Sequence, residues 1–181
     1  MAAAEFIRED PLGLNNHLAE EYPVIRIVPA DPAEPSVRTL IDELDAYQLS
    51  LYPAESNHLL DIETLRQPQM RFFAAAVDGS VLAIGGCWLH ADYAEIKWVY
   101  VSPQARGLGL ARTLMDRIEA EALAAGMAVA RLETGIRQPE AIGLYRKFGY
   151  VEREAFGGYP ADDPNSVFME KTLATVICDV E

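Results

Sequence analysis

Residues 99–115 read Val99-Tyr-Val-Ser-Pro-Gln-Ala-Arg-Gly-Leu-Gly-Leu-Ala-Arg-Thr-Leu-Met115, and this stretch decides the fold of the chain. A β-branched and aromatic run is followed by two glycines in three positions and then by a helical pattern. Gly107 and Gly109 have no Cβ, so a ligand can approach the backbone closely there. The helix that follows offers unpaired N–H donors and the positive end of its dipole. The sequence therefore predicts a strand, a glycine loop and a helix that together bind a phosphate-bearing ligand.

The charge around this stretch supports an anion site. The 181-residue chain has a formal net charge of −13, yet residues 96–115 hold three basic side chains, Lys97, Arg106 and Arg112, and no acidic one. The acidity of the whole chain argues against a nucleic-acid partner, because binding to phosphates in DNA or RNA depends on neutralisation by Lys and Arg. We therefore expect a small phosphate-bearing ligand at residues 96–115.

Three known phosphate-binding patterns were compared with this loop. A P-loop requires Gly-Lys-Ser/Thr at its end, and Leu110-Ala-Arg112 stands there instead. A dinucleotide fingerprint requires Gly or Ala where Arg112 stands, although Glu133 near the end of the next expected strand keeps that alternative open. The third pattern, Gln/Arg-x-x-Gly-x-Gly/Ala, is matched by residues 104–109. A glycine-rich turn without a ligand is the remaining alternative.

Hydrophobic periodicity predicts the strands and helices on either side of residues 99–115. Strands are expected at 24–28, 71–77, 80–89, 95–102, 129–134, 150–153 and 166–172. Helices are expected at 33–52, at 58–65, from Leu110 to just before Gly126, and from Pro139 to just before Gly149. This order predicts an α/β (α+β) fold: a mixed, mainly antiparallel sheet with a central strand-helix-strand unit and flanking helices. Residues 1–23 are expected to form an N-terminal arm, and residues 24–181 a single domain.

Composition narrows the cellular context. The chain has no run of about 18 apolar residues, so no membrane span is expected. Cys87 and Cys178 lie far apart without a CxxC pair, so neither a metal site nor a disulfide framework is expected. With no export signal at the N-terminus, we expect a cytoplasmic protein.

The chain resembles the GNAT superfamily of acetyl-CoA-dependent N-acetyltransferases. The resemblance rests on residues 104–109 and on the segments 94–103 and 132–150, the latter ending in Leu-Tyr-x-x-x-Gly-Tyr. It implies acetyl-CoA as co-substrate and no metal. It also allows a homodimer as one form of assembly. Many members carry Asn where this chain has Gln138, so the resemblance does not fix which polar contact Gln138 makes. The cofactor contacts that the resemblance implies are Val99, Val101, Arg106, Gly107, Leu108, Gly109, Leu110, Ala111, Gln138 and Tyr145.

The resemblance also implies that the acceptor amine attacks the thioester directly in a ternary complex. Tyr145 matches the family tyrosine that protonates or hydrogen-bonds the leaving thiolate, and a packing role beside Ile142 and Phe148 is the alternative. Glu95 is the candidate base, because partial burial of a carboxylate in an apolar strand would raise its pKa. A solvent-facing Glu95, or one paired with Lys97, is the alternative, and a chain of water molecules could replace the base.

Residues 51–60 contain a Tyr-Pro-x-Glu-Ser segment, which resembles a bacterial GNAT subgroup of undefined substrate. Glu55, Ser56, Asn57 and His58 follow one another here, where family members form the wall of the acceptor site. Helix capping by Ser56 is the alternative.

The distribution of charge suggests the kind of acceptor. Residues 1–65 hold 13 acidic and three basic side chains, a net of −10, against a net of −3 in the rest. We expect this acidity to attract a small cationic primary amine. A non-catalytic module that only binds acyl-CoA on the same fold is the alternative function.

Overall fold

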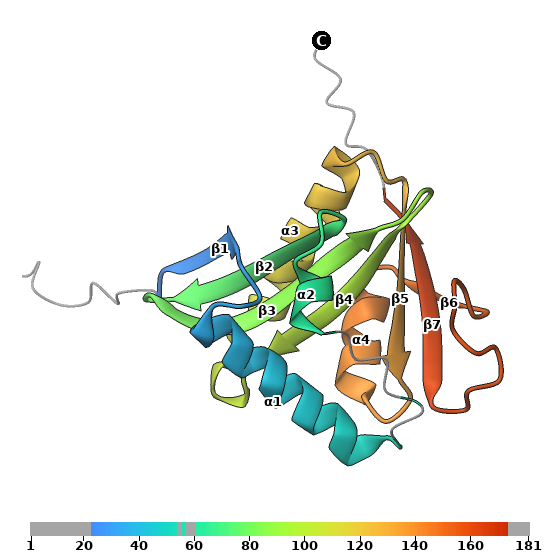
Figure 1. Ribbon diagram of the computed structural model, residues 1–181, viewed down its shortest axis with the longest axis horizontal. Coiled ribbons are helices and arrows are strands. Elements are labelled where there is room, and N and C mark those ends of the chain that lie inside the picture. Colours follow the sequence, from blue (N-terminus) through green and yellow to red (C-terminus); the bar gives the residue numbers. More distant parts are fainter. Residues whose placement is uncertain (1–22, 54–55, 57–60, 174–181) are drawn as a thin grey trace, which may run out of the picture.

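The computed structural model describes residues 23–53, 56 and 61–173, which form one seven-stranded sheet with helices on both faces (Figure 1). The sheet order is β1-β2-β3-β4-β5-β7-β6, and every pair is antiparallel except β4 with β5. The elements are β1 (Ile25–Pro29), α1 (Pro35–Leu51), α2 (Ile62–Leu65), β2 (Met70–Val77), β3 (Ser80–Leu89), β4 (Ala94–Val101), η2 (Pro103–Ala105), α3 (Leu110–Ala124), β5 (Val129–Gly135), α4 (Pro139–Lys147), β6 (Val151–Arg153) and β7 (Ser166–Thr172). The predicted fold class and element order are confirmed. The N-terminal arm expected at 1–23 lies outside the described residues, apart from Pro23.

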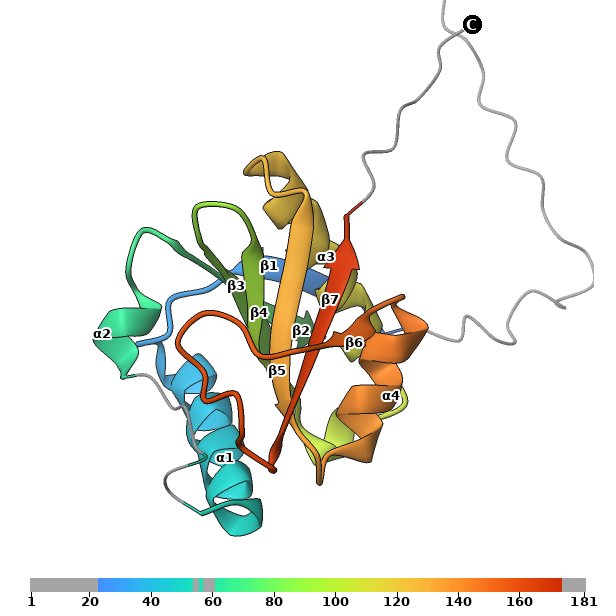
Figure 2. The same ribbon diagram turned by 90° about the vertical axis from the view of Figure 1, so that its right-hand side faces the viewer.

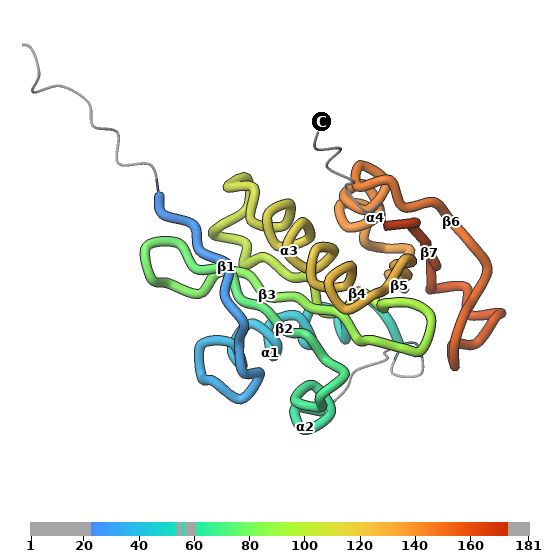
Figure 3. Tube along the Cα trace, turned by 90° about the horizontal axis from the view of Figure 1, so that it is seen from above, coloured from blue at the N-terminus to red at the C-terminus, as the bar shows by residue number. Residues whose placement is uncertain are grey.

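The sheet is covered on both faces, and Figures 2 and 3 show α3 and α4 on one side and α1 and α2 on the other. β2 shows how the sequence produces this arrangement, because successive side chains of a strand point to opposite faces. Phe73, Ala75 and Val77 join the core under α3, whereas Phe72 and Ala74 join the core under α1. Alternate side chains of β2 therefore pack in different cores, which explains why every residue of the strand except Arg71 is apolar.

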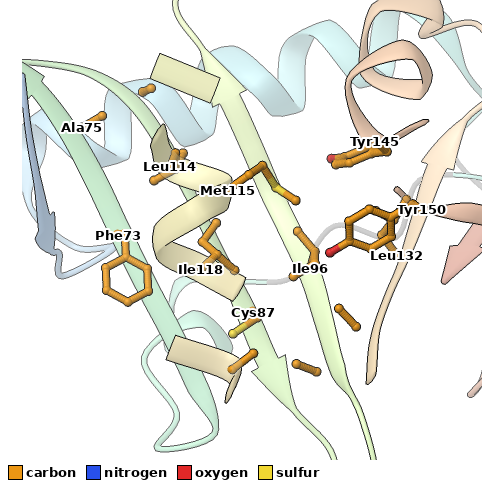
Figure 4. Packing of buried hydrophobic residues seen from close by; sticks show 14 of the residues in the cluster. Phe73, Ala75, Cys87, Ile96, Leu114, Met115, Ile118, Leu132, Tyr145 and Tyr150 are labelled. Atoms are coloured by element: carbon orange, nitrogen blue, oxygen red, sulfur yellow. The ribbon is translucent and has the colours of Figure 1, made fainter. Parts of the chain in front are cut away.

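The larger core lies between the sheet and α3 (Figure 4). Leu110, Leu114, Ile118 and Ala122 recur every four residues, and each is at most 1% exposed. This spacing places one stripe of α3 against the strands. Tyr145 of α4 belongs to the same core, so α4 is held on the face that α3 covers. Within the described residues no helix is long and apolar enough to cross a membrane.

The short helix α2 corrects one prediction. The described helix begins at Ile62 and is capped by Asp61, whose carboxylate accepts a 2.8 Å hydrogen bond from the Thr64 N–H. Ser56 therefore does not cap this helix, although helix capping was one of the two interpretations of Ser56. Residues 57–60 lie outside the described residues. Aspartate is a preferred N-cap, because its side chain accepts the N–H bonds left free in the first turn.

The two parallel strands diverge along their length, which Figure 1 shows clearly. β4 pairs with β5 only at Ala94, Glu95 and Ile96, although β4 continues to Val101. The register of β4 with β3 shifts over the same stretch, and Trp98 there has a φ of 56°. A positive φ is rare for a bulky side chain and typical of a bulge that redirects a strand. The bulge at Trp98 coincides with the gap that opens between β4 and β5.

Candidate active site

A cavity of about 100 Å³ lies where β4 and β5 diverge. Its walls come from both faces of the sheet, since α1 contributes Leu44 and Gln48 while α4 contributes Ala141 and Tyr145. The gap between the strands therefore connects the two faces. The other lining residues are Tyr52, Ser56, Ile96, Lys97, Trp98, Val99, Glu133, Thr134, Gly135, Gln138, Tyr159 and Asn165.

The glycine loop has the geometry that its sequence predicted. Gly107 and Gly109 have φ values of 87° and 78°, a left-handed conformation that glycine adopts without strain. A Cβ built on either one would meet no atom within 4 Å, so the space beside this backbone is open. Gly109 is the N-cap of α3, so the N–H groups of the first turn of α3 begin directly after it. Leu108 is 43% exposed, whereas Leu110 is buried and fixes the helix to the core.

Tyr145 is both a core residue and part of the cavity wall. Its side chain is buried, and its ring meets the Tyr150 ring at an edge-to-face distance of 5.9 Å (Figure 4). Burial, followed by the charge of nearby Glu133, raises the pKa of the Tyr145 hydroxyl above its ordinary value. The hydroxyl therefore carries its proton throughout the physiological range, as a hydrogen donor must. The packing and the catalytic interpretations of Tyr145 are compatible.

Glu95 is buried as expected, but the predicted direction of its pKa shift is wrong. Burial acts to raise the pKa, but the charge of Lys97 and hydrogen bonds from Lys97, Tyr159 and His90 outweigh it and lower the pKa. Lys97 Nζ and the Tyr159 hydroxyl donate to Oε1 at 2.7 and 2.5 Å, and His90 Nε2 lies 2.9 Å from Oε2. The pairing with Lys97, one of the two alternatives, is present. A carboxylate held by three polar groups is a poor proton acceptor at neutral pH.

Glu133 was not selected as a catalytic candidate, although the structure places it in the cavity wall. It follows Leu132, the last residue of β5 that pairs with β4. Burial is the largest effect on its carboxyl group and raises the pKa, against the lowering effects of Ser166 and Lys97. Like Glu95, Glu133 is a carboxylate inside a strand, but β5 also holds Arg131 and Thr134 and is not otherwise apolar.

The far end of α1 and the connection from β6 to β7 form one wall of the cavity. Ser56 Oγ lies 3.3 Å from Asp163 Oδ1 and accepts a 3.2 Å bond from Asn165 Nδ2. Ser56 thus lies in the predicted region of the site, while Glu55, Asn57 and His58 lie outside the described residues. Tyr159 contributes its ring, 5.3 Å from Lys97 Nζ. Tyr159 and Asn165 were missed because this connection gave only a turn signal in the sequence.

Val99 and Gln138, which are two of the predicted cofactor contacts, also line the cavity. Val99 lies beyond the last residue that pairs with β5, so this edge of the strand faces the gap. Val101 belongs to the same strand but pairs with Ala83 and is absent from the wall of the cavity. Gln138 Oε1 accepts bonds from the Gly135 N–H at 3.2 Å and Thr134 Oγ1 at 3.3 Å. The glutamine that replaces the usual asparagine thus fixes the turn between β5 and α4.

Among the residues that the structure describes, no group of three His, Cys, Asp or Glu side chains is arranged to hold a metal ion. The site consists instead of an opened sheet, a glycine loop at a helix N-terminus and protonatable side chains. These features define an acyltransferase that uses an acyl-CoA.

The comparisons with known proteins identify the family. The family described as "Acetyltransferase (GNAT) family" matches residues 37–150. A protein of Azospirillum brasilense named IAA acetyltransferase is 46% identical over 153 residues, covering 83% of this chain and 99% of that protein. The uncharacterized N-acetyltransferase YsnE of Bacillus subtilis (strain 168) is 36% identical over 141 residues, covering 76% of this chain and 92% of that protein. The chain belongs to the GNAT family of acetyltransferases.

A solved structure agrees with this assignment. The crystal structure of an acyl-CoA N-acyltransferase from Klebsiella pneumoniae has a TM-score of 0.70 and 35% sequence identity. The match covers 83% of this chain and 98% of the Klebsiella chain. The protein is therefore an N-acetyltransferase of the GNAT fold.

Proposed function

We propose that the protein transfers an acetyl group from acetyl-CoA to a primary amine by direct attack within a ternary complex. The observation that carries this proposal is the cavity that passes between β4 and β5 and is lined from both faces of the sheet. Two substrates could enter from opposite faces and meet at the gap. No covalent intermediate on the protein is needed, because bringing both reactants together supplies much of the rate enhancement.

The acetyl-CoA side is the face of α3 and α4. The N–H groups from Arg106 to Ala111 would bind the pyrophosphate, since the glycine backbone of this loop is open to a ligand. The exposed edge of β4 at Val99 would place the thioester in the gap and supply an N–H donor for the developing oxyanion. Tyr145 would donate its proton to the leaving thiolate, and its raised pKa keeps that proton in place beforehand.

The acceptor side is formed by α1, the segment around Ser56 and the connection from β6 to β7. We propose a small cationic amine, because residues 1–65 carry a net charge of −10. The expected result is a kcat/KM that falls as ionic strength rises, since salt screens long-range attraction. If kcat/KM does not change with salt, the acidic side chains of residues 1–65 contribute to solubility alone.

The test of the proposed function combines binding with turnover. At about 100 times its Kd, acetyl-CoA should stabilise the protein by about 2.7 kcal/mol, whereas NAD should not. Release of free thiol should then require a primary amine, which a panel of amine acceptors tests.

Tyr145→Phe serves as the catalytic variant, because it removes one hydroxyl from a buried ring and keeps the packing. It should lower kcat by about 10²-fold while the melting shift with acetyl-CoA remains. A melting shift without thiol release from any amine would favour the alternative of a non-catalytic acyl-CoA sensor.

A further inference from the structure

We propose that Tyr52 is a positioning residue that joins the end of α1 to the turn between β5 and α4 and so fixes the width of the cavity. The inference rests on the proposed transfer to an amine and adds what holds the two substrate sides in place. Figure 1 shows the end of α1 beside this turn, although α1 and α4 lie on opposite faces of the sheet. Tyr52 is the first residue of the Tyr-Pro-x-Glu-Ser segment, whose other polar side chains were the ones expected at the acceptor site.

Two hydrogen bonds join the end of α1 to the turn, and Arg137 donates both. Its backbone N–H donates to the Tyr52 hydroxyl at 2.8 Å, and its Nη1 donates to the Leu51 carbonyl oxygen at 2.9 Å. The last four carbonyl groups of a helix lack partners within the helix, and a cation beside them interacts favourably with the helix dipole. The last turn of α1 holds no basic residue, so Arg137 supplies that cation from another element.

Gly135 shows that the Tyr52 ring is seated closely against β5. A Cβ built on Gly135 would lie 2.1 Å from the Tyr52 hydroxyl oxygen and 2.3 Å from Cζ. Gly135 does not have the positive φ that would itself favour glycine, so the close approach of the ring is what requires glycine there. The Tyr52 side chain is buried, and its N–H donates to the Gln48 carbonyl oxygen at 3.0 Å, so α1 fixes its backbone.

Tyr52 makes this contact where the sheet is open. β5 pairs with β4 only as far as Leu132, and Gly135 is the last residue of β5. Tyr52 lines the cavity together with Gln48 of α1 and Gln138, the N-cap of α4. Gln138 Oε1 accepts a 3.2 Å bond from the Gly135 N–H, so the residue against which Tyr52 packs also sets where α4 begins. The distance between α1 and α4 across the cavity therefore depends on the Tyr52 contact.

This contact bears on the reaction because the two reactants must be aligned. In the proposed reaction the amine enters from the α1 side and the thioester from the α4 side. A misplacement of about 1 Å can cost about 10²-fold in rate. Release of α1 should therefore slow the acetylation of a short amine most, since a longer amine can fill the wider cavity. The glycine loop at 106–111 lies outside the cavity wall, so binding of acetyl-CoA should stay unchanged.

The test measures kcat/KM for two linear primary amines, n-propylamine and n-hexylamine, in Tyr52→Ala and in the wild type. For n-propylamine we expect a fall of about 10²-fold, and the ratio of n-hexylamine to n-propylamine should rise about tenfold. This ratio does not depend on the fraction of folded protein, so a loss of folded enzyme alone cannot change it. Tyr47→Ala is the matched control, because Tyr47 belongs to the same helix, is 38% exposed and lies outside the cavity wall.

Gly135→Ala perturbs the same contact from the other side. Its Cβ would displace the Tyr52 ring, so it should raise the amine ratio in the wild type and change it little in Tyr52→Ala, where no ring remains. In urea unfolding the midpoint should fall less when Gly135→Ala is introduced into Tyr52→Ala than into the wild type, which a double-mutant cycle measures. Tyr52→Phe keeps the ring and removes the acceptor of the Arg137 N–H. It should shift the ratio in the same direction by less, which keeps the test valid if Tyr52→Ala folds poorly.

The outcomes separate the two levels of the proposal. An unchanged amine ratio in either Tyr52→Ala or Gly135→Ala, or urea midpoints that fall additively, would overturn the role of Tyr52. Loss of the melting shift with acetyl-CoA in Tyr52→Ala would also overturn it, since the defect would then lie in cofactor binding. Absence of amine-dependent turnover in the wild type would overturn the proposed function instead, and the urea cycle would still decide whether Tyr52 joins α1 to β5.

Discussion

The buried Glu95 carboxylate accepts hydrogen bonds from Lys97 Nζ and the Tyr159 hydroxyl, and Lys97 Nζ also donates to that hydroxyl. These three groups should stabilise the fold, and Glu95→Gln measures their contribution. The Glu95 and Lys97 side chains are only 8% and 15% exposed, and Nζ lies 2.7 Å from Oε1. Glutamine keeps the shape but leaves the Lys97 ammonium without its counter-charge in a desolvated place. Removing one partner of a buried ion pair costs about 3–5 kcal/mol, and we expect about 3 kcal/mol because the Tyr159 hydroxyl remains at Nζ.

The assay is urea unfolding at neutral pH, with thermal melting beside it. A loss of about 3 kcal/mol corresponds to a fall in Tm of about 6–12 °C for a chain of this length. Glu152→Gln is the matched control, since Glu152 pairs with Arg146 on the surface with side chains 58% and 61% exposed. Such surface pairs contribute about 0–1 kcal/mol.

The pH dependence gives the sign of the effect independently. The pKa of Glu95 is lowered by folding, so its contribution to stability is present above the ordinary value of 4.5 and is lost as pH falls through the folded-state pKa. The difference in free energy of unfolding between wild type and Glu95→Gln should therefore shrink in acid. A cost no larger than that of Glu152→Gln, or a difference that grows as pH falls, would refute the reasoning.

Two substitutions at glycine should act in opposite directions. A Cβ on Gly86 would lie 2.2 Å from the Arg71 carbonyl oxygen of the neighbouring strand, and backbone cannot move aside cheaply, so Gly86→Ala should lower the free energy of unfolding by more than about 3 kcal/mol. Gly143, inside α4, has open space where its Cβ would be, so Gly143→Ala should raise the free energy of unfolding by about 0.5–1 kcal/mol through helix propensity. Urea unfolding of both variants checks the pair.

The sequence predicted most of the fold because its signals were local. The Asp78-Gly79 turn, the glycine loop and the stripe of α3 each specify an element through their own neighbours, and all three elements are present. The position of β7 between β5 and β6 could not be predicted in this way, because it depends on contacts between segments far apart in the chain. The bulge at Trp98 was missed for a related reason, since nothing in the residue type indicates a positive φ.

The sequence predicted the glycine loop of the candidate site but only part of the cavity wall on the α1 side. A glycine loop at a helix N-terminus is a continuous motif, so its residues are found together in the sequence. The cavity wall on the α1 side is assembled from α1, the Ser56 region and the β6–β7 connection, and Tyr159 meets Glu95 from 64 residues away. The pKa of Glu95 depends on that partner and on Lys97. The sequence alone therefore indicated the burial of Glu95 but could not give the sign of its pKa shift.

The divergence of β4 and β5 brings residues from both faces of the sheet to one space. Where strands are paired, their N–H and C=O groups bond each other, and the sheet separates its two faces completely. Beyond Ile96 and Leu132 that pairing ends, so the backbone of β4 can address a ligand and side chains from both faces border one space. Tyr145 of α4 and Gln48 of α1 both line this space because the sheet is open between them.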